Sequence, residues 1–220
     1  MSGMEIFWIV VGVILVLGIL ALIGLGVLFG LATNPNRFKV REVALGDVDD
    51  YIARRAAFAI TVIETTPLSR REVWDRLDSP YLTSLPFLRG PDWALRGGSP
   101  DQRQRSEIQV DARRTMSGTF LSVGQRVIEV TDRERVTLVG TGVSVPLAVK
   151  DFVERFTIVD GKRSNTVTVT WQIAGSPRFF GFLPWRWAVP LVRPVAGFML
   201  RQILRLQPYR RRDVRGEAAA

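Results

Sequence analysis

An uninterrupted apolar run near the N-terminus constrains this chain more than any other feature. Residues Ile6–Ala32 form 27 consecutive positions without a charged side chain. A helix needs roughly 20 apolar residues to cross the hydrocarbon core of a bilayer, so this run is long enough to span it and to tilt. Its glycines fit, because glycine is common in membrane helices. We therefore expect a transmembrane helix over 6–32.

Two other structures contain apolar segments of this kind. A cleaved signal peptide would carry basic residues before a shorter apolar core and a small-residue cleavage site after it, whereas here Glu5 is the only charged residue before the run. A buried helix of a soluble core is the second alternative. The length of the run and the missing cleavage site favour an uncleaved anchor.

Basic residues directly after the run indicate its orientation. Arg37, Lys39 and Arg41 follow it closely, and an excess of Lys and Arg marks the cytoplasmic side of a membrane. Residues 1–5 are therefore expected outside the cytoplasm and the rest of the chain inside it, in a single-pass protein of the cell membrane. The absence of cysteine agrees with a reducing compartment.

Positive charge is concentrated in the C-terminal part of the chain. The formal net charge is +9, and the span Arg178–Arg215 holds nine arginines opposed only by Asp213. On a tethered domain such a cluster is expected to meet anionic lipid headgroups; solvated charge and nucleic acid are the alternatives, and no nucleic acid partner is predicted. The expected membrane-surface residues are Arg37, Lys39, Arg41, Trp185, Trp187, Arg210, Arg211 and Arg212.

The missing residue types exclude several chemistries. The chain has no histidine and no cysteine, which removes Ser-His-Asp triads, thiolate nucleophiles and the usual zinc ligands. Glycine-rich nucleotide-binding motifs are absent as well. We predict no metal, no cofactor and no catalytic residue.

The first part of the expected domain shows a linker, a strand and a capped helix. Residues 33–57 are expected to form a solvated juxtamembrane linker with room for a short helix. Phe58–Thr65 is rich in β-branched residues and predicts a strand. Ser69 and Glu72 form a capping-box pattern that predicts a short helix over Ser69–Leu77.

Strand-like segments then follow one another as far as Ala174. Apolar and polar residues alternate most clearly in the last of them, and short turn signals separate most neighbours, so an antiparallel meander is expected. The preceding segment Arg89–Ser106 predicts a loop or a poorly formed edge, with Trp93 packed on the domain. The predicted strands are Glu107–Asp111, Arg113–Phe120, Gln125–Thr131, Arg135–Val145, Val149–Val159 and Asn165–Ala174.

An aromatic segment and an amphipathic helix are expected at the C-terminal end. Residues 178–192 mix Trp, Phe, Pro and Arg, which is typical of a segment at a membrane interface or at the gate of an apolar cavity. Pro194 fits the first turn of a helix over Val195–Gln207. Residues 208–220 are expected to be a basic disordered tail. The predicted apolar stripe of the helix is Val195, Met199, Ile203 and Leu206.

The order of these elements resembles a known α+β fold. A strand, short helices, an antiparallel meander and a long C-terminal helix are similar to the helix-grip fold of the START-like, polyketide cyclase/dehydrase superfamily, also called SRPBCC. The resemblance covers 58–207. It is carried by Ile60–Thr66 with the following Pro67–Asp75, by Val127–Val139 and by Phe152–Trp171.

The resemblance implies a curved sheet around the C-terminal helix with an apolar cavity between them. Members of that superfamily bind lipids, sterols, quinones or polyketides. We therefore expect a membrane-tethered module that carries or senses a lipid, quinone or polyketide-like molecule, with no protein partner named by the sequence. The expected cavity residues are Trp74, Phe87, Phe152, Glu154, Phe156, Trp171, Phe198 and Met199.

Two alternative functions stay open at this point. A cyclase- or dehydratase-type enzyme would place Glu154 or Glu129 inside the cavity, within hydrogen-bonding reach of Arg, Gln or Tyr. A tethered protein-interaction domain would have no cavity. Trp171 is expected to need a hydrogen-bond partner if it is buried.

Overall fold

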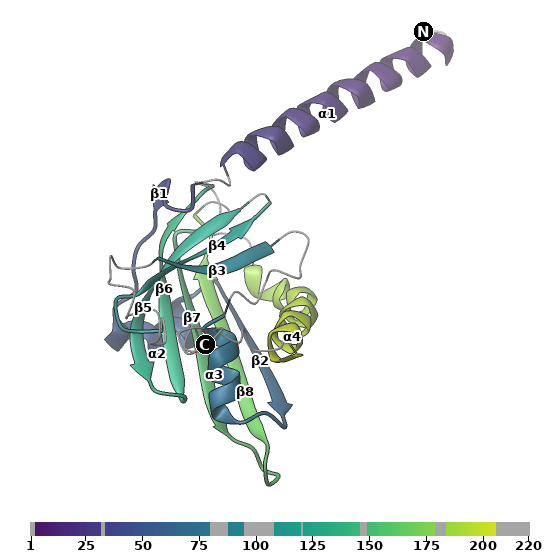
Figure 1. Ribbon diagram of the computed structural model, residues 1–220. Coiled ribbons are helices and arrows are strands. Elements are labelled where there is room, and N and C mark those ends of the chain that lie inside the picture. The colour runs from purple at the N-terminus through teal and green to yellow at the C-terminus, as the bar shows by residue number, and fades with distance from the viewer. Residues whose placement is uncertain are drawn as a thin grey trace, which may run out of the picture.

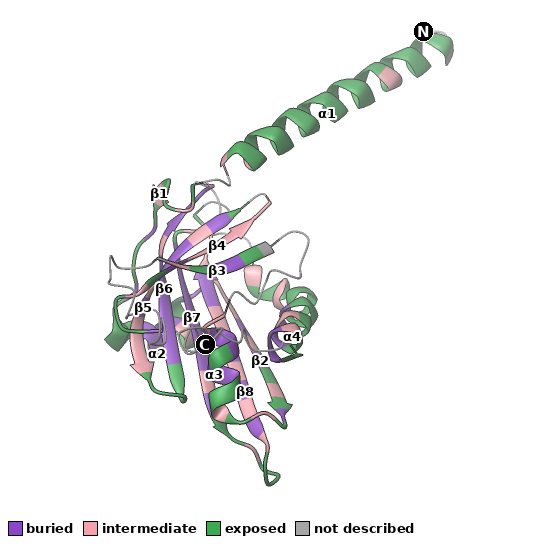
Figure 2. Cartoon of the chain, viewed as in Figure 1, coloured by how far each residue is buried: buried purple, intermediate pink, exposed green. Residues whose placement is uncertain are grey.

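A long N-terminal helix stands apart from a domain built on one sheet (Figure 1). The computed structural model describes residues 3–31, 34–79, 88–94, 108–119, 121–145, 149–178 and 184–205. Helix α1 (Gly3–Leu31) is long and apolar enough to span a membrane. Its apolar side chains are almost all exposed (Figure 2), as expected of a helix whose surroundings would be lipid rather than protein.

Eight antiparallel strands form a single curled sheet in the part of the chain that the structure describes. Its order is β2-β8-β7-β6-β5-β4-β3, and β1 pairs with the end of β6. The expected meander is confirmed, because consecutive strands from β3 to β8 are hydrogen-bonded neighbours. The strands are β1 Phe38–Lys39, β2 Phe58–Thr66, β3 Leu88–Ala94, β4 Arg113–Gly118, β5 Ser122–Thr131, β6 Arg135–Val143, β7 Asp151–Asp160 and β8 Val167–Ser176.

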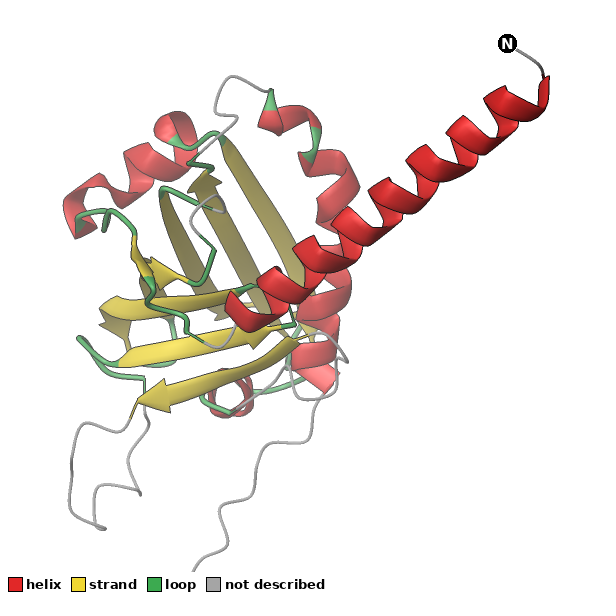
Figure 3. Ribbon diagram, turned by 90° about the horizontal axis from the view of Figure 1, so that it is seen from above, coloured by secondary structure: helices red, strands yellow, loops and turns green. Residues whose placement is uncertain are grey.

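Two helices cover the inner face of the sheet. Helix α3 (Arg70–Leu77) begins with the predicted capping box, in which Ser69 Oγ accepts from the Glu72 amide. Helix α4 (Val189–Arg205) packs along β2 and contacts α3. The main core lies between these helices and strands β2 and β5–β8. This arrangement is the expected α+β helix-grip architecture (Figure 3).

Helix α4 differs from the prediction in its start and in one residue of its predicted buried stripe. It begins at Val189, six residues early, and contains Pro194 in its interior. Val195 of the predicted stripe is exposed, whereas Ile203 is buried and Met199 packs against the main core as predicted. Leu206 lies outside the described residues. A helix that packs on a curved sheet presents the side chains nearest to the strands, which hydrophobic spacing alone does not specify. The residues that it buries are Ala196, Gly197, Leu200, Ile203 and Leu204.

The polar region before the meander also differs in part. Residues 88–94 form the edge strand β3, which pairs with β4, and Trp93 packs partly buried against the main core. Residues 108–111 form a turn, not the predicted strand, and Asp111 has a left-handed φ of 67°. A residue in that conformation ends extended pairing.

The segment expected to be a solvated linker packs on the outer face of the sheet. After β1 it forms three short turns, η1 (Leu45–Asp47), α2 (Val48–Asp50) and the π-helical η2 (Tyr51–Arg55). Val48 and Tyr51 are buried there against outward-facing residues of β6, β7 and β8. Apolar burial on the second face of the sheet explains why this segment is ordered.

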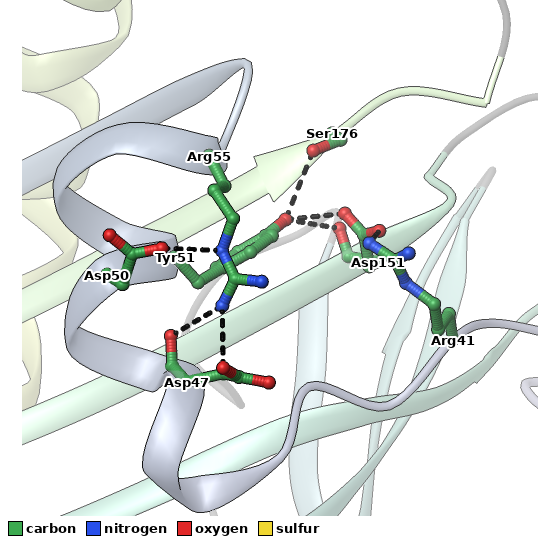
Figure 4. A network of polar contacts seen from close by, with 7 residues as sticks. All are labelled: Arg41, Asp47, Asp50, Tyr51, Arg55, Asp151 and Ser176. Carbon is green, nitrogen blue, oxygen red and sulfur yellow. Dashed lines mark hydrogen bonds and ion pairs between the residues drawn. The ribbon is translucent and has the colours of Figure 1, made fainter.

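A polar network fixes the same segment to the sheet (Figure 4). The Tyr51 hydroxyl donates to Asp151 Oδ1 over 2.5 Å and lies 3.2 Å from Ser176 Oγ. Arg41 Nη2 binds the other oxygen of the Asp151 carboxylate at 2.8 Å. Asp151 is buried, so these donors compensate its carboxylate. Burial and the Asp151 hydrogen bond raise the pKa of Tyr51 above its ordinary value.

We expect Tyr51→Phe to lower stability by about 1–3 kcal/mol at neutral pH, because a buried oxygen of Asp151 loses its donor. The raised pKa of Tyr51 adds a pH signature. The folded chain keeps the phenolic proton while the unfolded chain releases it above about pH 10, so alkaline pH favours unfolding of the native protein. Denaturant unfolding at neutral and alkaline pH measures both effects. Parallel alkaline losses in the variant and the native chain would contradict this account.

Candidate functional site

A buried polar cluster lies on the inner face of the sheet, where apolar residues surround it. Glu154 on β7 is its centre. Arg114 Nη2 donates to Glu154 Oε2 over 2.7 Å, and Gln125 Nε2 donates to the same oxygen over 2.6 Å. Trp171 Nε1 donates to Glu154 Oε1 over 2.8 Å. Strands β4, β5, β7 and β8 thus contribute one side chain each to the cluster.

The cluster is almost completely removed from solvent. Glu154 is 4% exposed, Arg114 3% and Gln125 2%. Arg114 Nε also donates to Gln125 Oε1 over 2.7 Å, which orients the amide toward the carboxylate. A buried ion pair persists only when further hydrogen bonds satisfy its remaining atoms, and here Gln125 and Trp171 supply them.

Strand alternation explains why these polar side chains meet. On β7, Glu154 shares its face with Phe156 and Ile158, both members of the main core. On β6, between β5 and β7, Gly140 pairs with Gln125. A Cβ atom at Gly140 would clash with the Phe152 ring at 2.2 Å, so the absence of a side chain at this position makes room for the ring.

The cluster is better suited to orientation than to proton transfer. An enzyme of the expected type would place Glu154 near Arg or Gln, and Arg114 and Gln125 meet that condition. Both oxygens of Glu154, however, already accept from fixed donors. A general base must instead face the proton that it removes. The geometry therefore favours Glu154 as the acceptor that holds Arg114 and Trp171 in position.

Trp93 borders this cluster and carries an unused donor. The Arg114 guanidinium carbon lies 5.6 Å from the centre of the Trp93 ring, in cation–π contact. Trp93 Nε1 is buried and has no hydrogen-bond partner among the described residues. Buried indole N–H groups usually find an acceptor. On α3, Arg76 Nε and Nη1 are likewise buried and unpartnered, and burial lowers the pKa of that guanidinium.

Most of the predicted cavity residues come together. Trp74, Phe156 and Trp171 belong to the main core, and Met199 packs against it. The Phe156 ring stacks on Trp171 with centroids 5.5 Å apart. Trp171 has the hydrogen-bond partner that its burial was expected to require.

Three other predicted residues do not join that group. Phe152 lies in a separate buried cluster with Val40 and Val143. Phe198 is 45% exposed on α4. Phe87 lies outside the described residues.

Glu129 lies on the opposite face from the one expected. Regular strand alternation would place Glu129 on the inner face with Val127, but the pairing of β5 with β6 shifts between these two residues. Such a bulge reverses the alternation of side chains. Glu129 therefore accepts from Thr137 Oγ1 over 2.6 Å on the outer face and lies 3.5 Å from Arg135.

Sequence reasoning missed Arg114 and Gln125 as partners of Glu154. A weak signal existed, because Arg113 and Arg114 are adjacent in a predicted strand and alternation must turn one of them inward. Which of the two turns inward depends on the register of β4 with β5, where Arg114 pairs with Gln125.

A shallow surface pocket of about 270 Å³ lies at the far end of the sheet, away from the cluster. Arg70, Glu134 and Thr157 are among its lining residues. The Arg70 guanidinium is bound to Asp160 and Glu134 at 2.8–3.0 Å. Because most of its lining residues are charged or polar, this pocket does not resemble the expected apolar cavity.

The residues expected at a membrane surface fall into several environments. Arg37, just before β1, and Lys39, within β1, are both exposed. Arg41 pairs with Asp151, as described above. Trp187 is 81% exposed in the short helix η4 (Trp185–Trp187), whereas Trp185 is half-buried. The arginines at 210–212 lie outside the described residues.

Neither the family models nor the curated proteins compared with this chain match it. Solved structures are similar over 66% of the chain. They include an uncharacterised protein from Bacillus thuringiensis (19% identity, 95% of that chain, TM-score 0.45). A START superfamily protein from Mycobacterium smegmatis is 12% identical over 91% of its length, with TM-score 0.44. CalU16 from Micromonospora echinospora is 10% identical over 73%, with TM-score 0.43. Likenesses this remote leave ligand and activity to be decided by the residues of the site.

Proposed function

We propose that this chain is a membrane-tethered cytoplasmic module that holds a hydrophobic molecule between the inner face of its sheet and α4, for carriage or sensing. The molecule would carry an oxygen acceptor on an otherwise apolar body, as lipids, quinones and polyketides do. The observation that carries the proposal is the buried, unpartnered indole donor of Trp93 beside the Glu154 cluster.

The tether rests on α1 and on the charges that follow it. Within the described part of the chain, no residues cover the exposed apolar surface of α1. Arg37, Lys39 and Arg41 support an orientation with the domain in the cytoplasm.

The proposed binding mode follows from the donors on the inner face. Glu154 holds Arg114 and Trp171 in place, and Arg114 in turn fixes the Trp93 ring. The indole N–H of Trp93 is then presented rigidly to an acceptor. Apolar sites with a few fixed polar groups orient hydrophobic ligands in this way.

A tethered protein-interaction domain without a small ligand is the second candidate. One observation favours it: Leu138, Leu200 and Ile203, between sheet and helices, are completely buried by protein. A closed interior of this kind leaves no space for a ligand unless α4 moves.

Native mass spectrometry of the full-length chain released from detergent micelles tests the proposal. We expect one small molecule at near-unit stoichiometry on the native chain. In Trp93→Phe the ring remains but the donor is lost, so retention should fall about tenfold, the equivalent of roughly one hydrogen bond.

Trp187→Phe is the matched control, because it makes the same change at an exposed site. It should retain the molecule as the native chain does. Lipids bound around α1 would be equal in all three proteins, so the difference between variants reports the inner site. A native chain without a bound molecule, or equal retention in Trp93→Phe, would favour the interaction domain.

A further inference from the structure

The outer face of α4 carries an apolar stripe that the described residues leave in solvent. Trp187 is 81% exposed, Leu191 79%, Val195 57% and Phe198 45%. Leu191, Val195 and Phe198 recur every three or four positions and so project from one side of α4. Trp187 lies in η4, directly before α4, and the four residues together are here called the α4 stripe. The opposite side packs on the sheet.

Basic residues accompany the α4 stripe at both ends. Arg186 and Arg193 are exposed near its start, and Arg205 is exposed near its end. The sequence that follows adds four arginines against one aspartate and one glutamate. A helix with Trp, Leu and Phe on one face and arginines around it has the composition of a helix that lies in a membrane interface. The arginines complement anionic headgroups.

The tether keeps this surface near the membrane. Only six residues separate Leu31, the end of α1, from Phe38 in β1, and that length spans at most about 25 Å. Arg178 Nη2, just after β8, donates to the Lys39 carbonyl over 3.1 Å. The end of β8, from which the chain continues to α4, therefore lies beside β1, where the chain arrives from α1. In both views α1 extends toward the side on which α4 lies (Figures 1 and 3).

We propose that the α4 stripe lies in the headgroup region of an anionic bilayer, the same one that α1 crosses. This inference rests on the proposed tether and not on the proposed ligand. It places the helix that covers the inner face directly against lipid, so a hydrophobic ligand would pass between membrane and site without crossing water.

A single fluorescent label tests the docking. The chain has no cysteine, so Leu191→Cys carries one environment-sensitive NBD group at the α4 stripe and nowhere else. Lys162→Cys, exposed in the β7–β8 hairpin at the far end of the sheet, is the matched control site. The full-length chain is inserted, one copy per disc, into nanodiscs of phosphatidylcholine alone or mixed with phosphatidylglycerol.

We expect blue-shifted emission and strong quenching by doxyl lipids at residue 191 in the anionic discs, and neither at residue 162. The double variant Arg193→Glu/Arg205→Glu should lower the ratio of docked to free domain about 30-fold or more. Raised salt should act in the same direction. Trp93→Phe should leave the signal unchanged, because the ligand donor lies on the inner face.

Equal solvent exposure of the labels at 191 and 162, in discs that retain the chain, would overturn the docking and leave the tether intact. A shift that appears only with two copies per disc would also overturn it, since a second copy would then cover the α4 stripe. Release of the chain from membranes by alkaline carbonate would instead overturn the tether, and the docking with it. None of these results depends on whether a ligand is bound.

Discussion

Replacing Glu154 by alanine is expected to lower the free energy of unfolding by about 3–5 kcal/mol, because it removes the carboxylate at the centre of a buried ion pair with Arg114. Arg114 is 3% exposed, so water cannot take the place of the lost carboxylate. Trp171 and Gln125 lose their acceptor in the same variant. Denaturant unfolding of the full-length chain in detergent micelles, followed by tryptophan fluorescence, measures the change.

Two further variants separate the effect of burying the ion pair from the effect of removing a charge. Glu64 also binds an arginine, with 2.7 Å between its Oε1 and Arg201 Nη1, but that pair lies at the surface. Glu64→Ala should therefore cost no more than about 1 kcal/mol. The double variant Glu154→Leu/Arg114→Met should recover much of the Glu154→Ala loss, because apolar residues often replace a buried ion pair without penalty. Equal losses for Glu64→Ala and Glu154→Ala would contradict this account of the cluster.

Leu200→Ala on α4 is expected to cost about 2–5 kcal/mol, since it removes a completely buried side chain and leaves a cavity between the helix and the sheet. Leu191→Ala is the matched control on the same helix. Leu191 is 79% exposed, and its truncation should change stability by no more than about 0.5 kcal/mol. The same unfolding measurement compares both variants.

The contrast between these two leucines tests the division of α4 into a packed and a free face. A large loss in Leu191→Ala would mean that other residues of the chain cover the α4 stripe, and the proposed docking would fail. A small loss in Leu200→Ala would mean that α4 is not held against the sheet. The helix-grip architecture in solution would then be in question.

Much of the fold could be predicted from sequence because it depends on local patterns. Alternation along Val167–Ala174 and the turns between strands identify the meander, and the pair Ser69 and Glu72 identifies the start of α3. The importance of Glu154 was also visible, since a carboxylate in phase with Phe156 breaks an apolar face. Burial of Trp171 implied an acceptor nearby.

The remaining features depend on contacts between distant residues. A one-residue bulge moved Glu129 to the outer face, and no local pattern marks the bulge. Residues 33–57 were predicted to be a solvated linker because they are largely polar, yet Val48 and Tyr51 pack against apolar residues on the outer face of the sheet. The start of α4 was missed because Pro190 suggested an interruption and Pro194 suggested the first turn of the helix, whereas both lie within the helix.

The central claim is that Trp93 presents its indole N–H to a bound molecule on the inner face. The most direct test is the ¹H–¹⁵N spectrum of the six tryptophan indoles in the full-length chain, as purified and after exhaustive stripping on hydrophobic resin, with Trp93 assigned by Trp93→Phe. We predict that stripping moves the Trp93 resonance while that of Trp171, which is bonded to Glu154, stays in place. A Trp93 resonance that is the same before and after stripping would contradict the claim.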